Sequence, residues 1–250
     1  MTLKDILRIE MNHIRLFSTG TIKQSGIIFF DERLKDKYYH NYFHITESNW
    51  DLNELKAYEI DHKKEGFVNF LFETGDTSFN DFFDGYKKET NAYYQAKIDE
   101  LSLTPKINPD IKRVDPLHDE LFFEFLYQDS MPYGESYAKG NAKRQQEVLS
   151  QNLSRYFYMK VTHQHQIIGH LNAHVEGDYA KIDDFSIVDS HQKKGFGTAL
   201  MKAMLDELKK LHVKEVYLVT DLADTAKELY ERMGYKQTGI FYHYIKMFKD

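Results

Sequence analysis

Blocks of apolar residues alternate with polar segments along the second half of the chain, and they predict a series of strands and helices. Short apolar runs between polar residues are typical of strands, whereas apolar residues spaced three and four apart form one face of a helix. The predicted helix that follows the strand at 182–188 carries Leu200, Met204, Leu208 and Leu211 on one face. The predicted strands are residues 111–114, 156–161, 167–175, 182–188 and 216–219, and the first predicted helix is residues 141–153.

The first half of the chain has a weaker pattern. The spacing of the apolar residues between 3 and 14 predicts a helix, residues 27–30 and 67–72 resemble buried strands, and a second helix is expected near 52–60. Two of the four prolines, Pro105 and Pro109, lie in the segment 103–110 and stiffen it, which makes it the best candidate for a linker. We therefore expect two parts joined by this linker. They are a smaller N-terminal α/β domain, residues 1–104, and a second domain, residues 110–250.

The most informative segment runs from the apolar strand at 182–188 into a turn with two glycines and then into a helix. Glycine allows a phosphate to approach the backbone, and the first turn of a helix offers unpaired N–H groups at the positive end of its dipole. A third glycine and an acidic partner, as in dinucleotide-binding turns, are missing, and so is a Gly-Lys-Ser/Thr nucleotide loop. The predicted anion site consists of Gln192, Lys193, Lys194, Gly195, Phe196, Gly197 and Thr198.

Two motifs in this half resemble those of the GCN5-related N-acetyltransferase (GNAT) family. Residues 192–197 fit the pattern Gln/Arg-x-x-Gly-x-Gly/Ala, and residues 224–235 resemble the family's second motif, a short helix with Ala-x-x-Leu-Tyr that ends in a Gly-aromatic pair. The resemblance covers roughly residues 110–250. It implies an α/β fold with a mixed, mostly antiparallel central sheet flanked by helices. Residues 1–104 are compatible with a degenerate copy of that fold, as in tandem members of the family.

The resemblance also assigns binding of acetyl-CoA, the family's acyl donor. Residues 192–198 would hold its pyrophosphate, while the backbone of Ser186, Ile187 and Val188 would bind the pantetheine amides where the strand parts from its neighbour. An N–H of Ile187 or Val188 would polarise the thioester carbonyl. The sequence has Ala223 where the family often has asparagine, so we expect Asp224 or Thr225 to cap the following helix instead.

Three residues are candidates for catalysis. Tyr230 matches the family's general acid, which donates a proton to the departing thiolate, although it also lies on an apolar helix face where a tyrosine can simply pack. Asp183 and Asp184 are adjacent on a predicted strand, so we expect them to point to opposite faces and at most one to face the substrate. That carboxylate would accept a proton through water or attract a cationic amine, or it would only be solvated.

The acceptor is predicted to be a primary amine: a small amine, an amino acid, a polyamine or a peptide. We expect a connecting loop at 129–140 to lie beside the acceptor, with Tyr133, Glu135 and Tyr137 as substrate-binding residues; an ordinary exposed connection is the alternative. The aromatic tract 36–45 in the first half is either a loop packed by its own side chains or a further functional segment.

Composition narrows the classes of function. A net charge of −6 over 250 residues argues against a nucleic-acid partner. The absence of cysteine excludes disulfides and an acyl-cysteine intermediate, which favours direct attack in a ternary complex. No apolar stretch approaches a membrane span, so we expect a cytoplasmic protein; no metal site is recognisable, and a homodimer remains open. The rival prediction is an inactive acyl-CoA-binding or regulatory protein.

Overall fold

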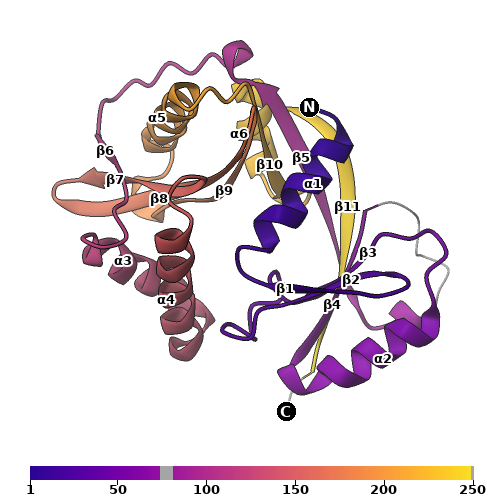
Figure 1. Cartoon of the computed structure of the whole chain (residues 1–250). Helices are drawn as coiled ribbons and strands as arrows, with labels where there is room; N and C mark the ends of the chain where they lie inside the picture. The colour runs from indigo at the N-terminus through magenta and orange to yellow at the C-terminus, as the bar shows by residue number, and fades with distance from the viewer. Residues whose placement is uncertain (74–80, 249–250) are drawn as a thin grey trace.

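The computed structural model describes residues 1–73 and 81–248. Within these residues an 11-stranded sheet runs through the whole molecule in the order β1-β2-β3-β4-β11-β5-β10-β9-β8-β7-β6 (Figure 1). Neighbouring strands are antiparallel except for the pairs β3–β4 and β9–β10. The predicted mixed, mostly antiparallel sheet flanked by helices is therefore confirmed.

The strands have the following bounds: β1 Thr19–Ile22, β2 Gly26–Phe30, β3 Tyr42–Ile45, β4 Phe67–Phe72, β5 Lys87–Lys97, β6 Asp110–Arg113, β7 Tyr156–His163, β8 Gln166–Glu176, β9 Tyr179–Ile187, β10 Glu215–Asp221 and β11 Lys236–Met247. The α-helices are α1 Leu3–Ile14, α2 Leu52–His62, α3 Glu120–Ser130, α4 Glu135–Gln151, α5 Phe196–Lys210 and α6 Ala226–Met233. Short 3-10 turns connect several of them.

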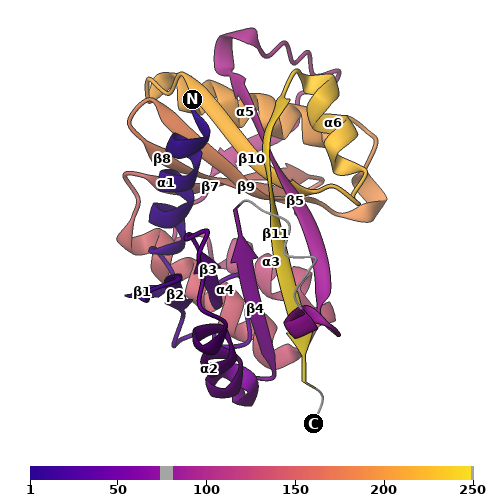
Figure 2. The ribbon, with the colours of Figure 1, turned by 90° about the vertical axis from the view of Figure 1, so that its right-hand side faces the viewer.

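Helices cover both faces of the sheet formed by β6 to β10. Figures 1 and 2 show α5 on one side of β7 to β9, with α3 and α4 on the other. Three residues of the apolar face predicted for α5, Leu200, Met204 and Leu208, are fully enclosed in the main core. The fourth, Leu211, is the C-cap of the helix and is 38% exposed. Burial of the three enclosed side chains contributes about 1.5–3 kcal/mol each to stability.

The first half of the chain builds the other end of the sheet. Helix α1 packs its buried Ile6 and Ile9 against β2, β4, β5, β10 and β11 in a second apolar cluster. Helix α2 covers a third cluster, in which Phe43 and Phe70 of the neighbouring strands β3 and β4 are fully buried. The helices and strands expected at 3–14, 27–30, 52–60 and 67–72 are all present.

Two long strands, β5 and β11, join the two halves. Strand β5 precedes the proline linker in sequence but pairs with β10 and β11, while β11, at the end of the sequence, pairs with β4 as well. The predicted division at 105–109 therefore lies in a connection of the chain and not at a break in the sheet. The apolar pattern of the sequence predicts neither strand.

Strand β9 is irregular in the region that contains the two candidate carboxylates. Its pairing with β8 shifts between Asn172↔Asp183 and His170↔Ser186, so that two residues of β9 face one residue of β8. Asp184 takes a left-handed conformation at this bulge, with φ 52°. On its other side, β9 pairs with β10 only as far as Lys181↔Tyr217, and beyond that point the two strands part.

The segment 129–140 differs from the expected loop. A 3-10 turn at Met131–Tyr133 leads into α4, which begins at Glu135, so Glu135 and Tyr137 lie in a helix. The turn into this helix passes through Gly134 with φ 104°, a conformation that glycine adopts without strain. The helix predicted at 141–153 therefore begins earlier than expected.

Candidate active site

The glycine turn forms the N-terminus of α5. Gly195 is the N-cap with φ 93°, and Lys193 before it is also left-handed, with φ 58°. Among the described residues no side chain caps α5, so its first N–H groups face outward from the turn. Gln192 shapes the turn, because its Nε2 donates to the carbonyl oxygen of Ile187 at 3.0 Å and to Asp189 at 2.9 Å.

Glycine is favoured at positions 195 and 197 of the turn for two different structural reasons. Gly195 is required by its positive φ, and a Cβ there would point at Ile107 at 3.6 Å. A Cβ on Gly197 would lie 3.1 Å from the ring of Phe185, so glycine lets the helix approach β9 closely. Backbone conformation and close approach therefore explain the two positions, in addition to the phosphate access that the sequence suggests.

A cavity of about 270 Å³ opens where β9 and β10 part. Its walls come from these two strands and from the start of α6, where the carboxylate of Asp224 accepts a hydrogen bond of 3.0 Å from the N–H of Ala226. Asp224 thus provides the expected cap, whereas the side chain of Thr225 does not. We call this cavity the strand cleft. It is lined by Ile182, Asp183, Asp184, Phe185, Leu218, Val219, Thr220, Asp221, Asp224, Ala226 and Tyr230.

Tyr230 of α6 lies in the wall of the strand cleft with only 8% of its surface exposed. Burial, assisted by the negative charges of Asp183 and Asp224, raises the pKa of Tyr230 to about 12. The phenol is therefore protonated throughout the neutral range and can act as a proton donor. Its neighbour Tyr235 lies in the core with its ring 6.1 Å from that of Tyr230.

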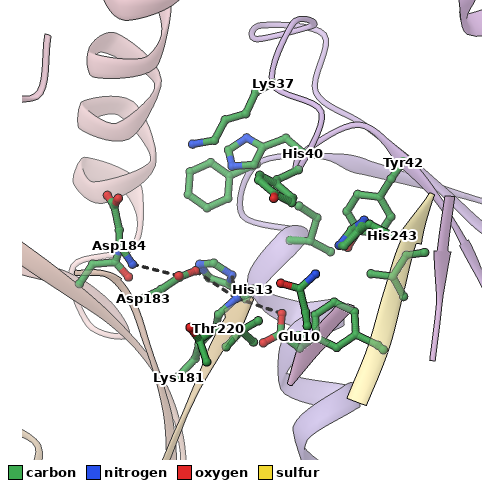
Figure 3. Close-up of a pocket in the computed structure, with 18 of the residues that line it drawn as sticks. Glu10, His13, Lys37, His40, Tyr42, Lys181, Asp183, Asp184, Thr220 and His243 are labelled. Atoms are coloured by element: carbon green, nitrogen blue, oxygen red, sulfur yellow. Dashed lines mark hydrogen bonds and ion pairs between the residues drawn. The ribbon is translucent and has the colours of Figure 1, made fainter. Parts of the chain in front are cut away.

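A second cavity, of about 390 Å³, lies between the two halves of the molecule, and we call it the central cavity (Figure 3). Helix α1, the tract 36–45 and strand β11 line it on one side, and α4 and strands β7 to β10 on the other. Its polar lining comprises Glu10, His13, Lys37, Tyr39, His40, Tyr42, Asn91, Gln145, Tyr156, Asn172, Lys181, Asp183, Asp184, Thr220, Asp221 and His243.

Asp183 and Asp184 both line the two cavities, so the expectation that they point to opposite faces of the strand is wrong. Strict alternation of side chains fails here because the bulge and the left-handed Asp184 rotate its carboxylate toward the same side. The N–H of Asp184 donates to Asp183 Oδ1 at 2.9 Å, which closes the bulge locally. Figure 3 shows Asp183 and Asp184 at one edge of the central cavity, with this hydrogen bond drawn as a dashed line.

Lys181 organises the charges on one wall of the central cavity. Its ammonium lies 3.0 Å from Glu10 Oε2, 3.0 Å from Asp183 Oδ2 and 3.3 Å from His13 Nδ1. Burial by itself would lower the pKa of Lys181, but the two carboxylates outweigh it and raise that pKa. Burial and the charge of Lys181 hold the pKa of His13 well below its usual value, so the imidazole is neutral.

Asp184 is bound by side chains of the neighbouring strands β7 and β8. Its Oδ2 accepts a hydrogen bond of 2.8 Å from the Tyr158 hydroxyl and lies 3.4 Å from His170 Nε2. The Asp184 side chain is 47% exposed, and its partial desolvation would by itself raise its pKa, but His170, Lys37 and the Tyr158 hydroxyl hold that pKa well below its ordinary range. Asp184 is therefore a fixed anion and a weak base.

The aromatic tract 36–45 has a place in the site. His40 and Arg144 both contact the buried carboxylate of Asp31, at 3.2 and 3.1 Å, and Lys37 donates to Asn141 at 3.1 Å. These contacts attach the tract to α4, so that Lys37, Tyr39, His40 and Tyr42 face the central cavity. The sequence by itself leaves the role of this tract open.

The remaining predicted residues lie elsewhere. Ser186, Ile187 and Val188 follow the bulge, beyond the last β9–β10 pair, as the predicted parting of the strand requires. Tyr133 and Glu135 are exposed, and neither they nor Tyr137 line either cavity, although the two tyrosine rings contact each other at 5.8 Å.

Some residues of the central cavity give no signal in the sequence. Glu10 and His13 interrupt an otherwise apolar helix face, and Asn91 and His243 belong to the two strands that the sequence pattern does not predict. Within residues 1–73 and 81–248 there is no group of three or more histidine and acidic side chains placed to hold a metal ion. In the same residues, no helix is both long and apolar enough to cross a membrane.

Comparison with known proteins assigns part of the chain to a family. Residues 117–235 match the model of the acetyltransferase (GNAT) family. These residues form a GNAT domain. It contains the bulged strand β9, the glycine turn and Tyr230, and the family to which it belongs uses acetyl-CoA.

Two curated proteins are similar to parts of this chain. The uncharacterised N-acetyltransferase CgeE of Bacillus subtilis is 40% identical over 58 residues, which cover 23% of this chain and 22% of that protein. The ribosomal protein bS18 alanine N-acetyltransferase of Haemophilus influenzae is 29% identical over 90 residues, 36% of this chain and 62% of that protein. The matches thus span less than two thirds of either relative.

One solved structure resembles the fold of nearly the whole chain, including the N-terminal half. The structure of a GCN5-related N-acetyltransferase from Kribbella flavida covers 98% of this chain and 96% of its own, with a TM-score of 0.69 at 9% sequence identity. At this identity the likeness concerns the fold alone. The likeness of fold extends through the N-terminal half, which is compatible with the degenerate copy of the fold considered for residues 1–104.

Proposed function

We propose that this protein transfers an acetyl group from acetyl-CoA to a primary amine, by direct attack in a ternary complex. The observation that carries the proposal is that the strand cleft and the central cavity share Asp183, Asp184, Val219, Thr220 and Asp221. A donor in the cleft and an acceptor in the cavity would therefore meet at one wall, which is the arrangement that direct transfer between two bound substrates needs.

The donor would bind along the parted strand and the glycine turn. The outward N–H groups at the start of α5, with Lys193 and Lys194 beside them, suit the pyrophosphate in charge and hydrogen bonding. The backbone of Ser186 to Val188 would hold the pantetheine amides, and an N–H of Ile187 or Val188 would polarise the thioester carbonyl.

The acceptor amine would bind in the central cavity as an ammonium ion. Four carboxylates line this cavity, those of Glu10, Asp183, Asp184 and Asp221, against the two cations Lys37 and Lys181. The histidines of its walls add no charge, since burial lowers the pKa of His40 and His243 to about 3 each. The excess of negative charge attracts a cation from solvent.

The reaction requires one proton to leave the amine before attack and one to reach the thiolate. Asp183 is the better placed carboxylate to accept the first proton, because Asp184 is held as a weak base. The amine nitrogen then forms the C–N bond, the C–S bond breaks, and Tyr230 donates its proton to the sulfur. The second proton of the amine nitrogen is released through solvent and restores the phenol, so that one proton is released overall.

The three residues at the start of α4 remain proposals for substrate binding. Tyr133, Glu135 and Tyr137 lie outside the two cavities, so they would contact only a part of an acceptor that extends beyond the central cavity. Glu135→Gln would then raise KM for an extended cationic amine and leave acetyl-CoA affinity unchanged. An unchanged KM for every extended amine would remove these residues from the site.

The test is a panel of primary amines with acetyl-CoA, assayed by release of the coenzyme A thiol. The protein has no cysteine, so it contributes no background thiol. We expect turnover of at least one amine, reduced by Asp183→Asn but not by Asp178→Asn, an exposed carboxylate paired with Lys214. Tight binding of acetyl-CoA by calorimetry without turnover of any amine would instead favour an acyl-CoA-binding or regulatory protein.

A further inference from the structure

The central cavity contains buried polar atoms that the protein itself leaves unpaired. Among the described residues, His13 Nε2, the Asn91 amide nitrogen and the Asn172 carbonyl oxygen make no hydrogen bond. Glu10 Oε1 is unpaired as well, although Oε2 of the same carboxylate accepts a hydrogen bond from Lys181. His13, Asn91 and Asn172 are 9%, 7% and 3% exposed, and all of them line the cavity. Buried polar groups are nearly always paired, so four unpaired atoms from residues around one cavity, Glu10 included, indicate a ligand that completes them.

The unpaired atoms include both donors and an acceptor. The Lys181 ammonium can only donate, so the Nδ1 of neutral His13 accepts from it, and Nε2 therefore carries the hydrogen. His13 and the Asn91 amide nitrogen offer donors, while Asn172 offers an acceptor. An ammonium group or a chain of them supplies donors alone. Hydroxyl groups both donate and accept, and thus match all three.

The positions of these atoms set the shape of the ligand. His13 belongs to α1, Asn91 to β5 and Asn172 to β8, so the polar atoms come from three separate elements around one cavity of about 390 Å³. Ligand pockets commonly measure about 300–1,000 Å³, which makes this a small one. Between the polar atoms the wall is apolar at Phe17 and Phe241, which suits the C–H groups of a carbon ring.

Resting on the proposed acetyl transfer, we infer that the acceptor is a compact polyhydroxylated primary amine of the size of one aminohexose. Its ammonium group contacts the wall of Asp183 that the two cavities share, and its hydroxyl groups pair with His13, Asn91 and Asn172. The N-terminal half of the chain, through α1 and β5, therefore supplies the specificity of the GNAT domain.

The experiment compares acceptors that differ in hydroxyl groups. The full chain is assayed with acetyl-CoA and with 2-, 3- and 4-aminohexoses, cyclohexylamine, spermidine and trialanine. Cyclohexylamine has a six-membered ring and one amine but no hydroxyl group. We expect the best aminohexose to exceed it at least about a hundredfold in kcat/KM, because the analogue leaves buried polar groups unpaired. Equal or better turnover of any of the three other amines overturns the inference.

Two variants test the named contacts. Asn172→Leu and, in a separate protein, Asn91→Leu keep the side-chain size and remove the hydrogen-bonding atoms. Each should lower kcat/KM for the aminohexose about tenfold or more, reduce the ratio of aminohexose to cyclohexylamine turnover, and leave acetyl-CoA affinity unchanged. Asn108→Leu, at an exposed linker position, is the control. If the preference for hydroxylated amines is the same in both cavity variants as in the parent, the inference is wrong.

A binding measurement separates this inference from the proposed function. Aminohexoses should raise the unfolding temperature without acetyl-CoA, and cyclohexylamine should not. Turnover of amines without any hydroxyl preference contradicts the inference alone. Absence of acetyl-CoA binding contradicts the proposed function, and absence of binding by every aminohexose contradicts the inference whether or not other amines react.

Discussion

The carboxylate of Glu10 accepts a hydrogen bond of 3.0 Å from the ammonium of Lys181, across 171 positions of sequence. This bond connects α1 of the N-terminal half to β9 of the GNAT domain, the strand that carries Asp183 and Asp184. Because Lys181 also contacts Asp183 at 3.0 Å, the position of α1 and the charge at the shared wall depend on one side chain.

We predict that Lys181→Met destabilises the protein and lowers its activity. Removing the cation leaves the half-buried carboxylates of Glu10 and Asp183 uncompensated, which should cost about 2–3 kcal/mol of unfolding free energy, less than for a fully buried pair. Urea unfolding measures this loss. In a double-mutant cycle with Glu10→Gln, the double variant should lose less than the sum of the two single losses. Strict additivity would show that the two side chains are not energetically coupled.

Thr198→Glu should weaken acetyl-CoA binding without harming the fold. Thr198 is the third residue of α5, where a carboxylate interacts favourably with the helix dipole and its free N–H groups. The same carboxylate would occupy and repel the pyrophosphate position, so we expect affinity to fall about tenfold or more by calorimetry. Thr198→Val is the matched neutral control. Unchanged affinity in a folded Thr198→Glu protein would place the pyrophosphate elsewhere.

Tyr230→Phe should lower kcat about a hundredfold, because it removes the proton donor and keeps the ring. The matched control is Tyr235→Phe, whose hydroxyl lies 3.7 Å from the sulfur of Met201 in the core and lines neither cavity. Both variants should unfold near the parental temperature. Parental turnover of Tyr230→Phe, on an amine for which chemistry limits the rate, would leave Tyr230 with a packing role only.

Stability should fall as the pH is lowered from about 6.5 to 4. Burial depresses the pKa of His40 and His243 to about 3 and that of His174 to about 4, against an ordinary value of 6.5. In this window the three histidines are protonated in the unfolded chain but neutral in the folded state. Each of them therefore lowers the free energy of unfolding by about 1.4 kcal/mol per pH unit. Urea unfolding at pH 7.5, 6 and 5 measures the slope.

Single variants test this interpretation of the pH dependence. His243→Gln should make the slope shallower by the share of one histidine, whereas His165→Asn, at an exposed turn with φ 65°, should not change it. The depressed pKa values of Asp31 and Asp184 add a loss only below about pH 4, where their ordinary value of 3.8 is reached. A slope that is identical in parent and His243→Gln would contradict the assignment.

Local features are predictable from the sequence because their causes lie within a few residues. The apolar spacing of α1 and α5, the buried runs of β4 and β10, the left-handed Gly195 and the cap by Asp224 all follow from side-chain periodicity and turn chemistry. The two motifs at residues 192–197 and 224–235 likewise indicate the GNAT family, because each is a short run of neighbouring residues.

The bulge at Asp184 is not predictable in this way, because it depends on how β9 aligns with β8. Adjacent residues of a regular strand face opposite sides, and only the shift in register opposite Leu171 places both carboxylates at the shared wall. The strands β5 and β11 are not predictable from the sequence pattern for a similar reason. Their mixed polar sequences become strands because a neighbour on each side completes their hydrogen bonds.

The sequence by itself determined most of the helices and strands, the glycine turn and the family of the C-terminal domain. Only the tertiary structure decided that Glu10, His13 and Asn91 of the first half face Asp183 across one cavity. Sequence patterns record local geometry, whereas the burial, pairing and pKa of a side chain depend on the neighbours that the folded sheet brings to it from distant positions.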